Sequence, residues 1–371
     1  RPGQVLVKIA CLMVGGAAGA VLRFLSVEFA ARRFGLAAYR TIFLVNLPVG
    51  LVVLVGLHIL LPNRKTGRRP KIDFLGALLL ALMVTGIVLW CDSGEIFGSM
   101  LSPASLGVVA AVAALTGLWV MVERRAPEPM IPLSLFSNRT VVLLLIVSIA
   151  SGSIAIGMVN YLALFLQTVH GLSPTAAGLF FIPVTIGLAV GALTGGRLMS
   201  ITGRYRPFAI LGLSISTLAF VTLSLFAVSA PLALMAVILG LHGLGIGFGQ
   251  QVPVLGVQNA ARGGDVGAAT GTVTLSRMVG ASAGISIYGA ILAHGLGRSA
   301  SIPGVGALTE LSPTAIAALP EPARALAVGG YGDTFTMLFM FAAVVCLIGL
   351  VAALALRPLL LGAPAKAGSS A

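Results

Sequence analysis

Residues 139–168 read RTVVLLLIVSIASGSIAIGMVNYLALFLQT, an apolar stretch with one charge, at its first residue. A helix needs about 20 apolar residues to cross roughly 30 Å of hydrocarbon, and this stretch is longer than that. In lipid, the backbone amide groups must be hydrogen-bonded within their own segment. The stretch therefore predicts a transmembrane α-helix.

Comparable stretches follow one another along the chain. Of its 371 residues, 58% are hydrophobic and 9% are charged, and the mean hydropathy is +1.07. Spans are expected at 8–30, 41–61, 73–92, 104–122, 139–168, 174–199, 207–228, 231–257, 267–295 and 333–356. The pattern predicts an all-α polytopic membrane protein with about ten transmembrane helices.

The net charge is +13, and the basic residues that produce it lie mainly at the ends of the predicted spans. Basic residues cluster at 63–71 and 123–125, at the ends of spans, and are not interleaved with aromatics as on a nucleic-acid-binding face. Positive charge stays on the cytoplasmic side of a membrane. Arg32, Arg33 and Arg40 disagree with this orientation, but the neighbouring loops outnumber them. Both termini are therefore expected in the cytoplasm, and the protein in the bacterial inner membrane.

Residues that commonly carry out catalysis or bind metals are scattered. The three cysteines suggest neither a disulfide framework nor a metal site. No nucleophile motif, P-loop or HExxH pattern is present. The four histidines lie on different spans and loops: His58, His170, His242 and His294. The chain is therefore not expected to be an enzyme or to bind a cofactor or metal.

Glycines recur at a spacing of four residues, which lets helix backbones approach closely in membranes. The sets are Gly15/Gly19, Gly187/Gly191/Gly195, Gly267/Gly271 and Gly280/Gly284. Tight helix packing is the expected role of these residues. Pro48, Pro183 and Pro253 lie within spans and are expected to kink them.

From about residue 39 onward, several segments resemble one transporter family in the same order. YRTIFLVNLPVG at 39–50 is similar to that family's WRWIFLINLPIG, with Arg40, Asn46 and Pro48 as signature residues. Further matching segments are DFLG at 73–76, PLSLF at 132–136, LQTVHGLSP at 166–174, and Ser276-Arg277 with Gly280 and Gly284. Together they resemble the fourteen-helix drug:proton antiporter branch of the major facilitator superfamily.

The resemblance implies a secondary active transporter. Such a protein exports small lipophilic or cationic compounds by proton antiport and alternating access. Its expected partners are the lipid bilayer, a small-molecule substrate and protons, but not nucleic acid. The family's first four helices have no counterpart here. The chain is therefore expected to be truncated, with a partial major-facilitator fold, and to need a missing N-terminal helix bundle or a partner membrane protein.

The same resemblance divides the chain into three parts. Residues 1–62 are expected to be a remnant of the N-terminal bundle, and 63–130 a basic linker with an inserted helix pair. Residues 131–371 are expected to form a C-terminal six-helix bundle, with a long external loop at 297–331.

GRLMSITGR at 196–204 resembles the cytoplasmic hinge motif GxLaDRxGR of the superfamily. Ser200 stands where the family has aspartate. The arginines of such a motif are expected to hold the loop to charges or to helix C-termini. The candidate hinge residues are Gly196, Leu198, Gly203 and Arg204.

Polar residues within spans are the candidates for a substrate pathway. An arginine at mid-span costs roughly 2.5–3.5 kcal/mol, so Arg277 is expected either to line a cavity or gate or to snorkel to the interface. The other candidates are Asn160, Tyr161, Gln167, Gln250 and Gln251. Hydrogen bonding between helices is the alternative role for these five. Acidic residues lie in connections, except for Glu28, so a carboxylate for proton coupling is missing or unusual.

Residues 15–35 resemble a different family. GGAAGAVLRF at 15–24 is similar to GGxxGAxxRY, which begins the first helix of small fluoride channels. This resemblance leaves a fluoride-like ion channel as one alternative function. A non-transporting membrane scaffold or partner subunit is the other.

Overall fold

The computed structural model describes residues 50–51, 54–56, 73–91, 93–99, 101–126, 129, 131–261, 265–298 and 308–357. The chain divides into two compact units, Arg1–Pro70 and Lys71–Ala371. The expected span at 8–30, most of the span at 41–61, and Arg40, Asn46 and Pro48 lie outside the described residues. All long helices among the described residues belong to the second unit.

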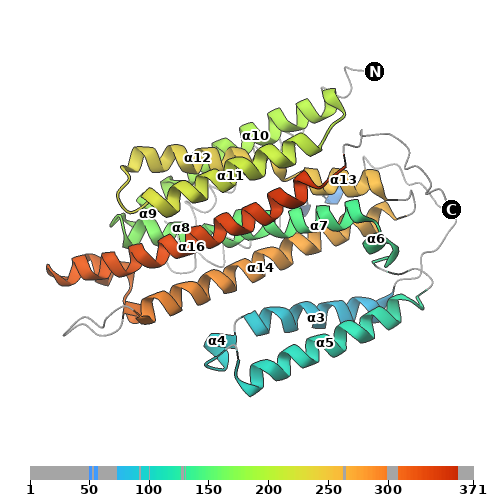
Figure 1. Ribbon diagram of the computed structural model, residues 1–371, viewed down its shortest axis with the longest axis horizontal. Coiled ribbons are helices and arrows are strands. Elements are labelled where there is room, and N and C mark those ends of the chain that lie inside the picture. Colours follow the sequence, from blue (N-terminus) through green and yellow to red (C-terminus); the bar gives the residue numbers. More distant parts are fainter. Residues whose placement is uncertain are drawn as a thin grey trace. The chain divides into compact units, whose positions relative to one another are not determined.

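A helical hairpin begins this unit. Helix α3, Phe74–Cys91, packs against α5, Pro103–Glu123, and the short α4, Ser93–Ile96, lies in the connection between them (Figure 1). Helix α5 starts sharply because the Ser102 hydroxyl accepts a hydrogen bond from the Ser105 backbone N–H and proline follows at the first turn. The predicted spans at 73–92 and 104–122 are therefore helical.

The 139–168 segment forms a helix with an interruption near its middle. It comprises α7, Arg139–Gly152, the π-helix η2, Ser153–Gly157, and α8, Val159–Thr168, and the short α6, Ser134–Ser137, precedes it. Asn138 caps the start of α7 through its side-chain oxygen, which accepts from the Thr140 N–H at 3.0 Å. The span is confirmed as a helix, but the π-helix was not predicted.

Two further spans are broken where proline predicts a kink. Phe180 separates α9, Pro174–Leu179, from α10, Phe181–Thr202, three residues before Pro183. Gln250 and Gln251 separate α12, Leu232–Gly249, from α13, Val252–Ala260, which has Pro253 in its first turn. Proline has no backbone N–H to bond the preceding turn, so the helix is interrupted there.

The remaining long helices are α11, Arg206–Phe226, α14, Val266–Arg298, and α16, Ala323–Leu354, with the short η3, Leu308–Glu310, and α15, Pro313–Ala317, between the last two. The loop expected at 297–331 ends earlier in the structure, because α16 begins at Ala323, about ten residues before its predicted span. Hydrogen bonds within the helix continue past the most apolar window. Among the described residues, seven helices are long and apolar enough to cross a membrane, and α3 is a shorter apolar helix.

The long helices run side by side (Figure 1). Helix α12 packs against α10 and α11, α16 packs against α11 and α7, and α14 packs against α7. Fully buried aromatic rings fill the space between α8, α11 and α16: Phe165, Phe220, Phe335 and Phe339. The predicted class, an all-α polytopic membrane protein, is confirmed.

Glycine spacing predicted close helix contacts correctly in two of the four sets. A Cβ on Gly187 or Gly191 would overlap the α12 backbone, and one on Gly280 would overlap the carbonyl oxygen of Ile149 in α7. Among the described residues, nothing lies within 4 Å of a Cβ built on Gly267 or Gly271, so the expected close contact is not found there. Gly15 and Gly19 lie outside the described part of the chain.

Candidate functional site

The π-helix η2 and helix α7 both pack against α14. The Ser153 hydroxyl and the Tyr288 hydroxyl are 2.9 Å apart and form a buried hydrogen bond. On α8, which follows the π-helix, the Tyr161 hydroxyl donates to the Ile285 carbonyl oxygen of α14 at 2.6 Å. The two tyrosine rings meet edge to face, with centroids 5.6 Å apart. Two hydrogen bonds and one contact between aromatic rings thus join the 139–168 span to α14.

Small residues allow these helices to come close enough for the contact. A Cβ on Gly152 would overlap the Arg277 carbonyl oxygen, and one on Gly157 would lie 3.2 Å from the Ala281 carbonyl oxygen. π-Helices are rare and are often found at functional sites. The crossing of η2 and α14 is therefore a candidate part of a substrate pathway.

Arg277 binds the broken end of a neighbouring helix. Its guanidinium Nη2 donates to the Gln250 carbonyl oxygen at 2.7 Å, and Gln250 is the C-terminal cap of α12. The carbonyl end of a helix carries partial negative charge, so a cation is stabilised there. The half-buried arginine reaches this carbonyl because Pro253 interrupts the α12–α13 span.

The structure does not gather the six predicted pathway residues at one place. Arg277 and Gln250 meet, and Tyr161 joins α14. The Gln167 amide donates to the Ala163 carbonyl of its own helix at 3.1 Å, so it does not link two helices there. Asn160 and Gln251 are exposed on the helix surface.

The hinge motif forms the turn between α10 and α11. Gly203 caps α10 in the left-handed conformation, with φ of 65°, and its N–H donates to the Met199 carbonyl at 2.9 Å. Gly196, Leu198 and Arg204 are exposed. A glycine at position 203 is thus explained by backbone geometry.

The arginine that reaches a helix C-terminus follows the predicted motif. Arg206 donates from Nη2 to the Leu354 carbonyl oxygen at 2.7 Å, at the end of α16. The expected type of contact is therefore present, but Arg206 makes it. The side chain of Tyr205 in the same turn is buried, and burial raises its pKa.

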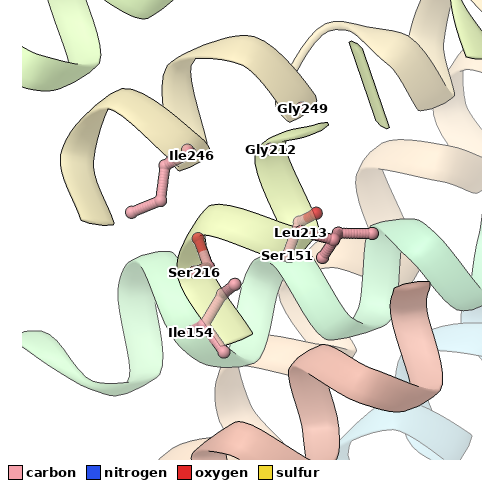
Figure 2. Close-up of a pocket in the computed structure, with 8 residues that line it drawn as sticks. Ser151, Ile154, Gly212, Leu213, Ser216, Ile246 and Gly249 are labelled. Carbon is pink, nitrogen blue, oxygen red and sulfur yellow. The ribbon is translucent and has the colours of Figure 1, made fainter. Parts of the chain in front are cut away.

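One further site in the structure has no recognisable motif in the sequence. A cavity of about 10 Å³ lies where α7, η2, α11 and α12 meet (Figure 2). Its lining residues are Ser151, Ile154, Gly212, Leu213, Ser216, Gly245, Ile246 and Gly249. The only signal in the sequence was small residues within apolar stretches, and these are common in membrane helices. Within the described ranges, no group of three metal-ligating side chains is found.

Comparison with known proteins identifies the family. The family model for the Major Facilitator Superfamily matches residues 3–285. The chain belongs to the Major Facilitator Superfamily. The match includes residues 15–35, which also resemble a fluoride channel helix.

Curated relatives in this superfamily include transporters and drug-resistance proteins. An uncharacterized MFS-type transporter of Mycobacterium tuberculosis is 32% identical over 324 residues, which cover 86% of this chain and 47% of the relative. A tetracycline resistance determinant of Streptomyces rimosus is 33% identical over 62% of this chain and 67% of its own length. The drug efflux pump JefA of M. tuberculosis is 30% identical over 77% of this chain and 55% of its length. The chain thus spans about half to two thirds of these relatives.

Proposed function

We propose that this chain acts in the efflux of small lipophilic or cationic compounds, by proton antiport and alternating access. The observation that carries the proposal is its similarity to relatives named as a tetracycline resistance determinant and a drug efflux pump. Alternating access in such folds rocks helix bundles about a site near the midplane of the bilayer. The broken helices at Phe180 and at Gln250–Gln251 suit such motion.

The roles proposed for the three parts of the chain follow the domain boundaries predicted from the sequence. Residues 131–371 are assigned to one six-helix bundle, 63–130 to an inserted helix pair, and 1–62 to part of the opposite bundle. In this arrangement the termini face the cytoplasm of a bacterial inner membrane. A remaining N-terminal bundle, on this chain or on a partner, completes the transporter.

The proposed substrate path runs along the exposed face of α7, α8 and α14. This face carries Ile149 of α7 and Ile156 of the π-helix η2, 41% and 42% exposed, followed by Asn160 of α8. Met278 and Ile285 are exposed on α14. An apolar wall with a few hydrogen-bonding groups suits lipophilic cations.

Arg277 is assigned a gating role in this scheme. Its bond to the Gln250 carbonyl joins α14 to the α12–α13 break, so movement of either helix changes the same contact. The turn at Gly203 and the Arg206 bond to α16 serve as the hinge.

Ethidium efflux tests the function. Cells expressing the chain, alone and extended by the coding sequence upstream, are loaded with ethidium and energised. We expect energy-dependent loss of fluorescence from at least one of the two, abolished by a protonophore. Asn160→Ala and Arg277→Ala should slow efflux at normal membrane levels. Thr222→Val is the matched control, because this hydroxyl bonds only within its own helix at Leu218.

The outcomes separate the parts of the proposal. Correct insertion of both forms without efflux would refute transport of this substrate class. Efflux that persists in the presence of a protonophore would refute proton coupling alone. Equal rates in Asn160→Ala, Arg277→Ala and Thr222→Val would refute the site assignment alone.

A further inference from the structure

The cavity between α7, η2, α11 and α12 is closed partly by backbone. Gly212 of α11 and Gly245 of α12 pack against each other so closely that a Cβ on either would overlap or crowd the other's carbonyl oxygen. A Cβ on Gly245 would also lie 2.8 Å from Ser216 Oγ. The missing side chains leave a space of about 10 Å³ that no group in the described part of the chain fills.

A hydroxyl group in this cavity lacks a hydrogen bond. Ser216 is 1% exposed, and its Oγ has no partner among the described residues. Figure 2 shows Ser216 near Ile246, with Ser151 and Ile154 of the neighbouring helix lining the same space. A buried hydroxyl without a partner is unfavourable, and in hydrocarbon no bulk water replaces the partner.

A second unpartnered polar atom lies in the next layer of the same junction. His242 is 2% exposed, and its Nδ1 has no hydrogen-bond partner within the described ranges. Its ring packs edge to face on Phe220, with centroids 4.6 Å apart. Phe220 lies one helical turn after Ser216 on α11. The His242 side chain is hydrogen-bonded to the backbone of Ile154, which lines the cavity.

The size and chemistry of the space fit one small ligand. A single water molecule needs a cavity with roughly 10–15 Å³ open to its centre and two or more polar partners. Drug-sized ligands need pockets of about 300 Å³ or more. Purely apolar cavities stay dry, but this one has two serine hydroxyls. A water molecule would satisfy the Ser216 hydroxyl without any movement of the helices.

We propose that this junction is a water-binding site inside the membrane. One water molecule bonds to Ser216 Oγ and to the Ser151 hydroxyl, with the His242 imidazole as the next polar neighbour. The site links α7, α11 and α12 through an exchangeable ligand instead of a direct side-chain bond. It does not depend on the transport activity proposed above.

Radiolytic footprinting of the full chain in lipid nanodiscs tests the site. X-ray pulses generate hydroxyl radicals from bound water, and mass spectrometry then locates the oxidised side chains. We expect Leu213, which lines the cavity, to be oxidised several-fold faster than Leu223, which is also buried and lies on the same helix away from the cavity. Equal rates at the two leucines in the native chain would overturn the proposal.

Substitutions then separate bound water from general solvent access. Ser216→Val fills the space and removes the hydroxyl, so fast oxidation of Leu213 should disappear. Ser224→Val is the matched control, because this buried hydroxyl bonds the Val221 carbonyl of its own helix at 2.8 Å. Should the valine variant not fold, Ser216→Ala removes the hydroxyl with little change in volume and should also slow the labelling. Unchanged labelling of Leu213 in a folded Ser216 variant would refute the site.

Discussion

At the scale of single residues, absence of a side chain decides where helices meet. Gly280 lies where α14 touches α7, and a methyl group there would overlap the carbonyl oxygen of Ile149. Gly271, on the same helix, has open space around its Cβ position. The same residue type therefore has opposite consequences at two positions of one helix.

These two glycines give a matched stability test. Gly280→Ala should lower stability by about 1–3 kcal/mol, because the added methyl forces the two backbones apart. Gly271→Ala should leave stability unchanged or raise it by up to about 1 kcal/mol, because alanine favours the helix. Thermal unfolding in detergent, followed by size-exclusion chromatography, measures both. Equal loss in the two variants would contradict the close contact at Gly280.

At the scale of elements, irregularities within helices create the polar contacts of the site. Proline breaks the α12–α13 span, and the Gln250 carbonyl oxygen at the break accepts a hydrogen bond from Arg277. The π-helix similarly brings Ser153 to Tyr288. A continuous α-helix would satisfy its own carbonyls and leave a mid-span arginine without such an acceptor.

Removing the Arg277 side chain should therefore destabilise the backbone around the break between α12 and α13. A hydrogen bond to a charged group contributes about 1.5–3 kcal/mol, so Arg277→Ala should speed backbone hydrogen exchange at 250–255 by roughly ten- to hundredfold. Arg298→Ala, which removes an exposed charge at the end of the same helix, is the control. Hydrogen exchange with mass spectrometry reads both. Faster exchange in the Arg298 variant as well would point to a general charge effect.

At the scale of the whole bundle, a hydrogen bond joins the turn between α10 and α11 to the end of α16. Arg206 follows α10 and bonds the carbonyl of Leu354, 148 residues later. Arg204, two residues earlier, is exposed. A charge-assisted hydrogen bond thus links the hinge turn to the end of α16, in addition to the packing of α11 against α16.

Arg206→Ala should free the end of α16. A cation at a helix C-terminus contributes roughly 0.3–1 kcal/mol, so hydrogen exchange at 352–356 should rise about two- to fivefold. Arg204→Ala should leave exchange there unchanged. The same measurement at 250–255 gives an internal reference. No difference between the two arginine variants would contradict the assignment of Arg206 to the hinge.

The sequence by itself determined the helical membrane class and the positions of most described spans. It also placed the breaks near Pro183 and Pro253, because hydropathy, segment length and the missing proline N–H are local properties. The family resemblance was visible because short motifs such as 132–136 and 196–204 keep their order along the chain.

Only the tertiary structure decided which residues meet. Tyr161 and Ile285 are 124 residues apart, and the cavity around Ser216 needs three separate segments to come together. The same spacing of glycines is packed at Gly280 and open at Gly271, and no local pattern distinguishes them. Contacts between helices depend on how each helix is rotated and how far it slides, and these are set by the packing of all its neighbours.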